Sequence, residues 1–420
     1  MNDNTRPAAE LEPRVSSSSV KNRRSSLVAA IFLMATSAIG PGFITQTATF
    51  TAKMGGAFAF GILACIVIDF IVQLNVWRIV TLTGKRASDI ANEALPGSGY
   101  VLAILVLAGG LVFNVGNIAG AGLGLNALLG ISPQWGGIVS GVIALGIFLY
   151  KRAGLIVDRI MIVLGLLMVV LTLFVAYASH PPLGEALRQT IAPDTINFAS
   201  ITTIIGGSVG GYITYAGAHR LLDKGTVGKE HIGEVSRAAF SGILVTGIMR
   251  YVLFIAILGV VASGVTLDVS GATANPAAQA FEVAAGKTGL AIFGFIMWAA
   301  GISSVIGAAY TSISFLNTFA PALTERGRHW ATVIFILVTL ITYASIGKAP
   351  SALLVFAGGF NGLILPLGLT LFLYVGWRRS DLMGGYHYPR WLLILGAVVC
   401  LITWSMAIDS IGTVFSFIGL

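Results

Sequence analysis

The residues best placed to bind a small molecule lie around two glycine-rich interruptions in long apolar stretches. The first interruption is Gly40-Pro41-Gly42, inside the stretch 27–50, and the second is residues 206–211, inside the stretch 201–222. A broken helix leaves backbone N–H and C=O groups without intrahelical partners, and in lipid these groups must face protein or a water-filled cavity. Two interrupted helices in corresponding halves of a chain point to the substrate site of a transporter.

The residues around both breaks are polar, aromatic or glycine, and none of them is charged. They are Ser37, Phe43, Thr45 and Gln46 near the first break, and Ser208, Gly210, Gly211, Tyr212, Thr214 and Tyr215 at the second. Hard divalent cations need anionic oxygen ligands, and transition metals favour His, Cys, Met or carboxylate. The half-helix that follows each break presents N–H groups and a positive dipole end, which suit an anion. We therefore predict a neutral or anionic small molecule with hydrogen-bonding edges, and neither a metal site nor a cofactor.

Ionisable side chains also occur inside or beside the apolar stretches, where they are costly and usually paired or functional. Asp69 is either a structural partner or a protonatable coupling site, and for Arg250 we favour a snorkelling or carboxylate-paired role over substrate contact. His219, Arg220 and Asp223 are interpreted as a gate or a loop salt-bridge cluster, with His219 as a proton carrier in the alternative interpretation.

Other polar and glycine-rich stretches add candidates. Asn361 could reach the site from a later apolar stretch, and a hydroxyl-rich stripe either lines the cavity or bonds across helices. The members of this stripe are Ser303, Ser304, Tyr310, Thr311, Ser312 and Ser314. The spacing of Gly116, Gly120 and Gly124 is typical of a close-packing helix face. No strand precedes these glycines, so a dinucleotide-binding loop is rejected.

The composition identifies an integral membrane protein. The 420 residues are 56% hydrophobic and only 10% charged, with a mean hydropathy of +0.89, whereas soluble domains carry about 25% charged residues. Cys65 and Cys400 both lie in apolar stretches, so no disulfide framework is implied. Nothing resembles a nucleic-acid-binding module or a soluble catalytic domain, and we do not expect an enzyme.

Apolar runs long enough to cross a bilayer, roughly 17–25 residues each, number about eleven. Their approximate centres are Gly40, Cys65, Asn114, Gly141, Gly165, Val209, Leu253, Ile302, Phe335, Leu363 and Gly396. Lysines and arginines concentrate in the N-terminal segment and in alternate loops. The loops on the opposite side hold only Lys53, Arg188, Lys287 and Lys348. Arg250 lies inside a span. The positive-inside rule then predicts a cytoplasmic N-terminus and an external C-terminus.

The two breaks fall in the first and sixth spans, five spans apart. Five is an odd number, so the two halves run in opposite directions, as in a LeuT-like inverted repeat of 5+5 helices. We expect an all-α membrane protein with a disordered cytoplasmic tail at 1–26 and a transporter core at 27–376. The core divides into repeats at about 27–178 and 199–376, and a further transmembrane helix covers 391–416.

The span order, the Gly40-Pro41-Gly42 break and the Ile204–Val209 approach to the second break resemble the NRAMP family of proton-coupled divalent-metal transporters. The resemblance extends from about Leu33 to Leu373 and implies a LeuT-like fold of eleven or twelve helices. The metal-site signatures differ, however. The family's Asp-Pro-Gly-Asn reads Gly40-Pro41-Gly42-Phe43 here, and its Met-Pro-His matches Gly210-Gly211-Tyr212.

The acidic positions that serve proton transfer in the family's third helix match Asn114 and Asn117, and asparagine does not ionise. The chain thus resembles a divergent bacterial NRAMP-like branch, through residues 35–43, 210–214, 218–223 and 309–312. Some members of that branch resemble proteins encoded beside 5-oxoprolinase subunits, which suggests 5-oxoproline as cargo.

We therefore expect a secondary transporter of the bacterial inner membrane that works by alternating access on a small organic solute such as a carboxylate. Its partners would be this solute, the lipid bilayer and a coupling proton, with no nucleic acid. The alternatives are proton-coupled transport of Mn²⁺ or Mg²⁺, and a receptor or scaffold that does not transport.

Overall fold

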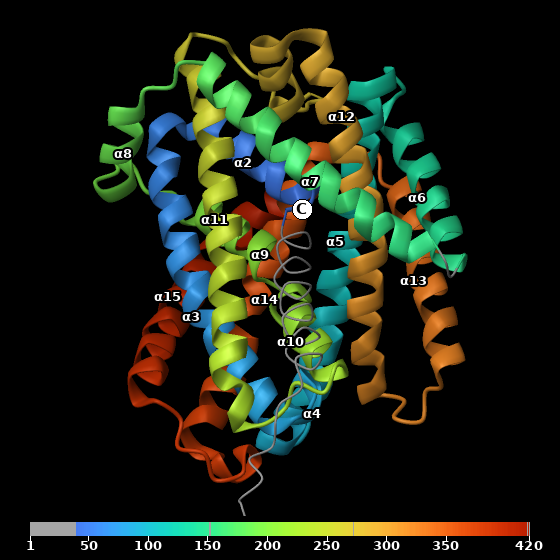
Figure 1. Cartoon of the computed structure of the whole chain (residues 1–420), viewed down its shortest axis with the longest axis vertical. Helices are drawn as coiled ribbons and strands as arrows, with labels where there is room; N and C mark the ends of the chain where they lie inside the picture. Colours follow the sequence, from blue (N-terminus) through green and yellow to red (C-terminus); the bar gives the residue numbers. More distant parts are fainter. Residues whose placement is uncertain (1–38, 151–152, 272, 418, 420) are drawn as a thin grey trace, which may run out of the picture.

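A computed structural model describes residues 39–150, 153–271, 273–417 and 419. Ser37, the tail at 1–26 and the first part of the first predicted span lie outside these residues. All regular elements in the described ranges are helical, as the composition predicts, and they stand side by side as one bundle (Figure 1).

The helices follow the predicted spans closely. Their bounds are α2 Pro41–Met54, α3 Phe58–Thr83, α4 Ala87–Ala94, α5 Ser98–Leu129, α6 Pro133–Leu149, α7 Ala153–Ala178, α8 Leu183–Ile191, α9 Phe198–Ser208, α10 Ile213–Asp223, α11 Ile232–Ala262, α12 Pro276–Ile313, α13 Glu325–Ser345, α14 Pro350–Arg378 and α15 Arg390–Ser416. Short 3₁₀ turns occupy Gly55–Ala57, Lys229–His231, Ser314–Thr318 and Ser380–Met383. Each predicted span centre falls within a helix or, for Gly40 and Val209, directly at the end of one.

Within the described residues, seven helical segments are long and apolar enough to cross a membrane, and the bent pair α7–α8 makes an eighth. The two members of this pair meet at 109°. Helix α6 has 17 residues, and α9 and α10 have 11 each. We assign these three helices to spans only from their place in the bundle. The count of about eleven spans therefore remains a prediction.

Helix α5 runs through the centre of the bundle and packs most extensively against α12, as well as against α14 and α6 (Figure 1). Its glycines allow these contacts. A Cβ at Gly120 would overlap the ring of Pro41, and one at Gly124 would overlap the backbone of Trp298. The predicted close-packing role of this glycine stripe is confirmed, and it fixes the start of α2 against α5.

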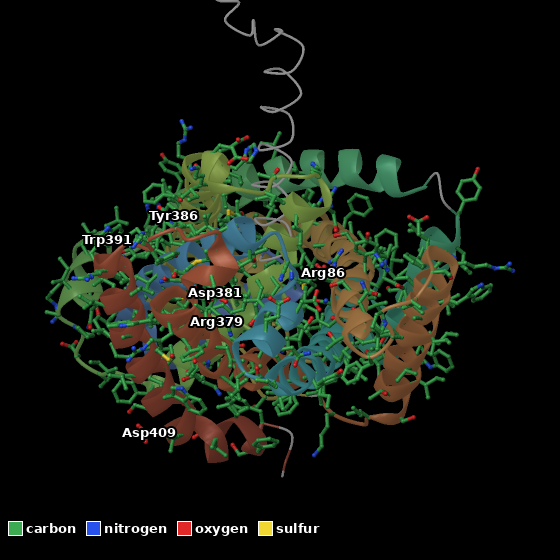
Figure 2. The ribbon with its side chains drawn as sticks, turned by 90° about the horizontal axis from the view of Figure 1, so that it is seen from below. Arg86, Arg379, Asp381, Tyr386, Trp391 and Asp409 are labelled. Carbon is green, nitrogen blue, oxygen red and sulfur yellow. The ribbon has the colours of Figure 1, made fainter. Side chains whose placement is uncertain are left out.

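The loops that follow α3, α10, α12 and α14 all lie at the lower end of the bundle in Figure 1, together with α4. We call this end the gate end. Figure 2 views it directly and shows Arg86, Arg379 and Asp381 on it. These are the basic loops for which the positive-inside rule predicts a cytoplasmic position.

Candidate functional site

The first break ends where α2 begins. Gly40 caps the helix in an extended conformation (φ −97°, ψ −176°), Pro41 follows at the first helical position, and no side chain caps this end. The Ile44 N–H makes the first intrahelical bond, to the Gly40 carbonyl at 3.3 Å. The Gly42 and Phe43 N–H groups therefore have no intrahelical acceptor, and the positive end of the α2 dipole lies at the break.

Polar side chains from α5 and α12 converge on this break. A Cβ at Gly40 would lie 3.1 Å from Ser304 Oγ and 3.8 Å from Asn117 Oδ1. Asn117 is fully buried, and in the described part of the chain its amide atoms and Ser304 Oγ have no hydrogen-bond partner within 3.5 Å, with the Tyr212 hydroxyl close to the amide. Tyr212 lies beside Asn117, and its ring meets Phe113 edge-on at 5.5 Å between centroids. We call Gly40, Phe113, Asn117, Tyr212 and Ser304 the asparagine cluster.

Unpartnered polar atoms are costly in a buried site, at about 1–3 kcal/mol each. Native proteins keep few of them without a functional reason or a bound water. The asparagine cluster thus offers an amide donor, an amide acceptor and a hydroxyl to a bound molecule.

The second break is packed in a different way. Gly211 adopts φ +56°, which favours glycine, and a Cβ there would overlap the Asn361 side chain. A Cβ at Gly206 would overlap the backbone of Gly358 and Gly362, and one at Gly210 would lie 2.7 Å from the Asn361 carbonyl oxygen. The second break is therefore a tight seam between α9 and α14, with no room for a side chain at Gly210.

Two buried amides hold this glycine seam together. Gln46 Nε2 donates to the Leu354 carbonyl at 3.0 Å, and Asn361 Nδ2 donates to the Gly109 and Ala357 carbonyls at 3.1 and 2.8 Å. Gln46 also fills the space that side chains at Gly207 and Gly358 would need. Gln46, Gly210, Gly211 and Asn361, which the sequence places among substrate-binding candidates, thus all pack in the seam, where Gln46 Oε1 and Asn361 Oδ1 have no hydrogen-bond partner among the described residues.

A buried guanidinium contacts both α2 and α9, the helices next to the two predicted breaks. Arg250 on α11 is 2% exposed, and its Nη1 donates to the Ile204 carbonyl of α9 at 3.2 Å. Its Cζ lies 4.2 Å from the ring centroid of Phe43, in the first turn of α2. Among the described residues Nε and Nη2 have no hydrogen-bond partner, and no carboxylate lies within 4.0 Å. The guanidinium therefore keeps donors available next to both breaks.

The Cys65 thiol lies between Arg250 and Asp69. Cys65 Sγ is 3.5 Å from Arg250 Nη1, 3.6 Å from Asp69 Oδ2 and 3.7 Å from Ser208 Oγ. Asp69 is 5% exposed, and its Oδ1 has no partner in the described ranges. We call Cys65, Asp69, Ser208 and Arg250 the arginine cluster, which holds one acidic and one basic group.

The predicted gate residues meet α4 at the gate end. His219 Nε2 accepts a hydrogen bond from the Ala87 N–H at 3.1 Å, and Arg86 pairs with Asp223 at 2.6 Å. His219 also stacks on Tyr215, with 6.0 Å between ring centroids. These contacts fix α10 to the start of α4. Arg220 has no ion-pair partner within 4.0 Å among the residues described.

The remaining candidates lie apart from both clusters. Asn114 donates to Thr339 Oγ1 on α13 at 3.2 Å, and Tyr215 is buried against Phe315 and Phe372. Tyr310 is 52% exposed and faces the outside of the bundle. In the part of the chain that the structure describes, no three His, Cys, Asp or Glu side chains lie close enough to hold a metal ion.

Sequence reasoning named Asp69, Ser208 and Arg250 separately but missed the arginine cluster as one assembly, and it missed Phe113. One signal was present: Cys65, Asp69, Gln73 and Trp77 recur every four residues and so share one helix face. Arg250 could not be added to that face from its spacing, because it comes from a distant helix.

Comparison with known proteins yields one family and consistent relatives. The family model described as natural resistance-associated macrophage protein-like matches residues 31–413. An uncharacterized membrane protein of Haemophilus influenzae is 50% identical over 96% of this chain and 98% of its own length. An uncharacterized membrane protein of Bacillus subtilis is 49% identical over 92% of this chain and 94% of its own.

Two solved structures share the fold. A manganese transporter of Eremococcus coleocola, in complex with an aromatic bis-isothiourea substituted compound, superposes with a TM-score of 0.77 at 15% identity, over 98% of this chain and 91% of its own. MhsT in complex with L-phenylalanine superposes with a TM-score of 0.64 at 17% identity, over 93% and 98% of the two chains. The predicted LeuT-like all-α fold is thereby confirmed. The first neighbour is named as a manganese transporter, and the second is a complex with L-phenylalanine.

Proposed function

The chain belongs to the natural resistance-associated macrophage protein family, and from this premise we propose that it is a secondary transporter that moves a small organic carboxylate by alternating access. It is a multi-pass membrane protein with the fold of known transporters. The inner membrane, the cytoplasmic N-terminus and the external C-terminus belong to the proposal.

The observation that carries the proposal is the buried Arg250 guanidinium between the two broken helices. It contacts α9 through Ile204 and α2 through Phe43, and it retains unpartnered donors among the described residues. Arginine binds carboxylates through a planar fork of donors. The same positive charge, next to the positive end of the α2 dipole, repels a divalent cation. The Arg250 guanidinium itself therefore favours an anion over Mn²⁺, with Asp69 as the one acidic group of the cluster beyond Cys65.

The asparagine cluster supplies the second half of the recognition. Asn117 offers one donor and one acceptor, which match the C=O and N–H of an amide or lactam edge. Phe113 and Tyr212 provide aromatic surface beside it. A small molecule with a carboxylate and a lactam, such as 5-oxoproline, uses both clusters, with its carboxylate on Arg250 and its lactam on Asn117.

The metal alternative has little support from the side chains. By the resemblance, the family's ligand positions match Gly40, Phe43 and Gly210, and the seam leaves no space for a longer side chain at Gly210. A cysteine thiol and one carboxylate do lie together in the arginine cluster, but Arg250 is beside both.

Uptake into proteoliposomes tests the function. We expect saturable uptake of labelled 5-oxoproline by the purified chain and no uptake or calorimetric binding of Mn²⁺. Arg250→Met should lower the apparent affinity for the carboxylate about tenfold to a hundredfold, because a charged hydrogen bond contributes about 1.5–3 kcal/mol.

The matched control is Arg188→Met, which removes an exposed arginine paired with Asp194 at the opposite end of the bundle from α4. It should leave uptake unchanged. Micromolar Mn²⁺ binding would overturn the carboxylate proposal in favour of metal transport. Failure to take up any organic acid or metal, with no alternation in cysteine-accessibility labelling, would favour a receptor or scaffold.

A further inference from the structure

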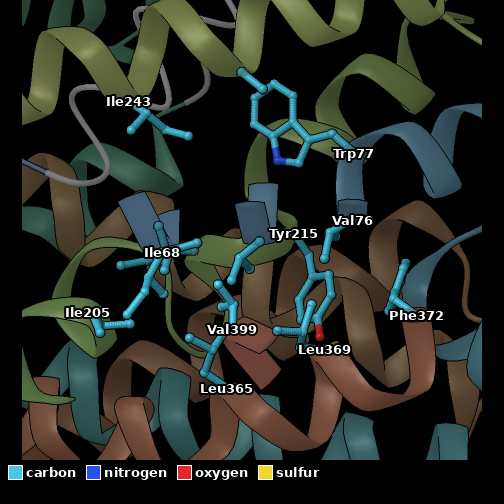
Figure 3. Close-up of a cluster of buried hydrophobic side chains, with 14 of the residues drawn as sticks. Ile68, Val76, Trp77, Ile205, Tyr215, Ile243, Leu365, Leu369, Phe372 and Val399 are labelled. Carbon is cyan, nitrogen blue, oxygen red and sulfur yellow. The ribbon is translucent and has the colours of Figure 1, made fainter. Parts of the chain in front are cut away.

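Much of the bundle interior is filled by closely packed apolar side chains. In the cluster of Figure 3, Trp77 of α3, Tyr215 of α10 and Leu365 of α14 project into one core. The packing there is so close that a Cβ at Gly217 would overlap the Trp77 indole ring. Protein interiors of this kind contain few voids larger than a water molecule. A larger cavity elsewhere in the same bundle is therefore a departure from its general packing.

Such a cavity, of about 260 Å³, opens between α5, α13 and α14. Two of its lining residues, Thr342 and Lys348, have polar side chains, and the other six are apolar. The apolar lining residues are Leu111, Val112 and Val115 of α5, Ile346 after α13, and Leu353 and Phe356 of α14. None of the eight belongs to the asparagine cluster or the arginine cluster. We call this cavity the α5–α13 pocket.

The polar groups of the α5–α13 pocket leave its interior apolar. The Thr342 hydroxyl donates to the Val338 carbonyl of its own helix at 2.8 Å. Lys348 belongs to the loop between α13 and α14, and a Cβ at Gly419, after the end of α15, would lie 2.9 Å from its Nζ. Among the described residues, no carboxylate lies within 4.0 Å of this ammonium group. The pocket thus combines an apolar body with one positive charge at the helix ends.

The α5–α13 pocket lies at the edge of the bundle that faces lipid. Helix α13 stands at this edge in Figure 1, and Ile334, Val338 and Ile341 on its outer face are 41–63% exposed. Leu111 and Val112 are partly exposed as well, although α5 runs through the centre of the bundle. The loop that holds Lys348 is at the end opposite the gate end. The pocket is therefore within reach of lipids in the leaflet at that end.

The shape and chemistry of the pocket favour one kind of occupant. Ordered water needs several polar partners, and apolar cavities stay dry. A helix from a second copy is about 10–12 Å across with its side chains, which is too wide for this space. An alkyl chain makes dispersion contacts with all six apolar walls. A lysine ammonium binds phosphate as a point charge and snorkels to the membrane interface. An acyl chain linked to a phosphate matches both parts of the pocket.

We propose that the α5–α13 pocket binds one anionic membrane phospholipid, with an acyl chain between α5, α13 and α14 and its phosphate on Lys348. The lipid would strengthen a contact that leads to the asparagine cluster. Asn114, next to the lining residue Val115, donates to Thr339, one turn before the lining residue Thr342. Bound lipid should therefore stabilise the packing of α13 on α5. This inference does not depend on what the chain transports.

Lipid titration of the full chain in a neutral detergent tests the proposal. Native mass spectrometry counts bound lipids, and thermal unfolding measures their effect on stability. The probes are phosphatidylglycerol, phosphatidylcholine with the same acyl chains, and glycerol 3-phosphate, which has no chains. We expect one retained phosphatidylglycerol per chain and a saturable rise in melting temperature. Phosphatidylcholine should bind about fivefold more weakly, since its ammonium group offsets the phosphate charge, and glycerol 3-phosphate should have no effect.

Replacement of the charge tests the headgroup contact. Lys348→Met keeps the alkyl stem and removes the ammonium, so it should weaken phosphatidylglycerol binding about fivefold, the factor expected for one lysine beside an anionic headgroup. Binding of phosphatidylcholine should be unchanged. The matched control is Lys287→Met, which removes an exposed lysine of α12 outside the pocket. It should leave the binding of both lipids unchanged.

A larger side chain inside the pocket tests the acyl-chain contact. Val112→Phe places a ring where the chain would lie, so binding of both lipids should fall at least about tenfold through loss of buried methylene contacts. The melting temperature without lipid should stay constant or rise, because the ring fills a cavity. Val139→Phe on α6, at a position that is 46% exposed, is the matched control and should change neither property.

The opposite results overturn the proposal in distinguishable ways. Equal binding of the two lipids, unaffected by Lys348→Met, would remove the role of the charge. Undiminished lipid binding in Val112→Phe would place the lipid elsewhere. Protection by glycerol 3-phosphate equal to that by phosphatidylglycerol would assign Lys348 to a soluble phosphate. A dimer that Val112→Phe abolishes would assign the pocket to a second copy of the chain. Absence of any saturable lipid effect on the wild-type chain would also contradict the proposal.

Discussion

The two helix breaks look alike in the sequence but differ in what surrounds them. At the first break, Asn117 and Ser304 keep polar atoms unpartnered beside Gly40. At the second break, Gln46 Oε1 and Asn361 Oδ1 are also unpartnered among the described residues, but Asn361 and the backbone of α14 fill the space beside the glycines to contact. In the described residues the two breaks therefore differ in how closely their glycines are packed, and both keep unpartnered polar atoms.

The difference in packing predicts separate roles for the two breaks. The seam between α9 and α14 has no space for a substrate, whereas α2 presents its N-terminus and Phe43 between the asparagine and arginine clusters. Binding specificity should therefore respond to residues near the first break, and folding should respond to the glycines of the second.

The largest effect is expected from Gly206→Ala. The added methyl group would overlap the backbone of Gly358 and Gly362, which cannot rotate away as a side chain could. Overpacking of this kind costs about 3 kcal/mol, the upper end of its usual range. Thermal unfolding of the detergent-purified variant, followed by size-exclusion fluorescence, should show a clear loss of folded protein.

Two other glycines serve as controls for that prediction. Gly40→Ala places its methyl group 3.1 Å from the Ser304 hydroxyl, which can turn, so this variant should fold and lose substrate affinity. Gly146→Ala on α6 meets nothing within 4 Å and should change neither property. If Gly206→Ala were as stable as Gly146→Ala, the second break could not be a packing seam.

A smaller effect, and one of opposite sign on stability, is expected from Asn117→Leu. This change removes two unpartnered buried polar atoms, so the melting temperature should stay constant or rise. Loss of one or two hydrogen bonds to the substrate should weaken binding about tenfold, or about 1.4 kcal/mol. A thermal-shift titration with 5-oxoproline measures both quantities. A large fall in stability with unchanged affinity would assign Asn117 to packing instead.

Much of this architecture follows from the sequence, because apolar length, helix breaks and basic loops are local properties. The span centres, the helix start at Pro41, the second break and the close packing at Gly120 are all predictable in this way. The contrast between Gly40 and Gly211 is not, since it depends on Asn117, Ser304 and Asn361, which come from distant helices. The resemblance to a metal-transporter family correctly predicts the fold.

The surroundings of the charged Arg250 likewise depend on distant helices and could not be predicted from the sequence. An isolated arginine in an apolar stretch favours snorkelling or a carboxylate partner, as its sequence context predicts. In the structure its Nη1 contacts Cys65 and the Ile204 carbonyl, and Asp69 lies beyond the thiol. Only the packing of α11 against α2, α3 and α9 shows that this charge lies next to both breaks.

The smallest effect is expected at the gate end, from Asp223→Asn. The Arg86–Asp223 pair joins α10, the half-helix after the second break, to the start of α4, and the aspartate side chain is 42% exposed. Exposed pairs contribute about 0.2–1 kcal/mol, so the balance between closed and open gates should shift only about two- to fivefold.

Maleimide labelling of a cysteine placed at Ser88, which is buried beside this pair, measures the shift as a faster reaction. The native thiols of Cys65 and Cys400 are buried and contribute little background. Asp381→Asn, which breaks the Arg379–Asp381 pair at the same end without touching α10, is the matched control. Equal labelling rates in the two variants would mean that α10 is held by the His219 bond to Ala87 and by the Trp77–Gly217 contact, so that the second break would be rigid on both of its sides.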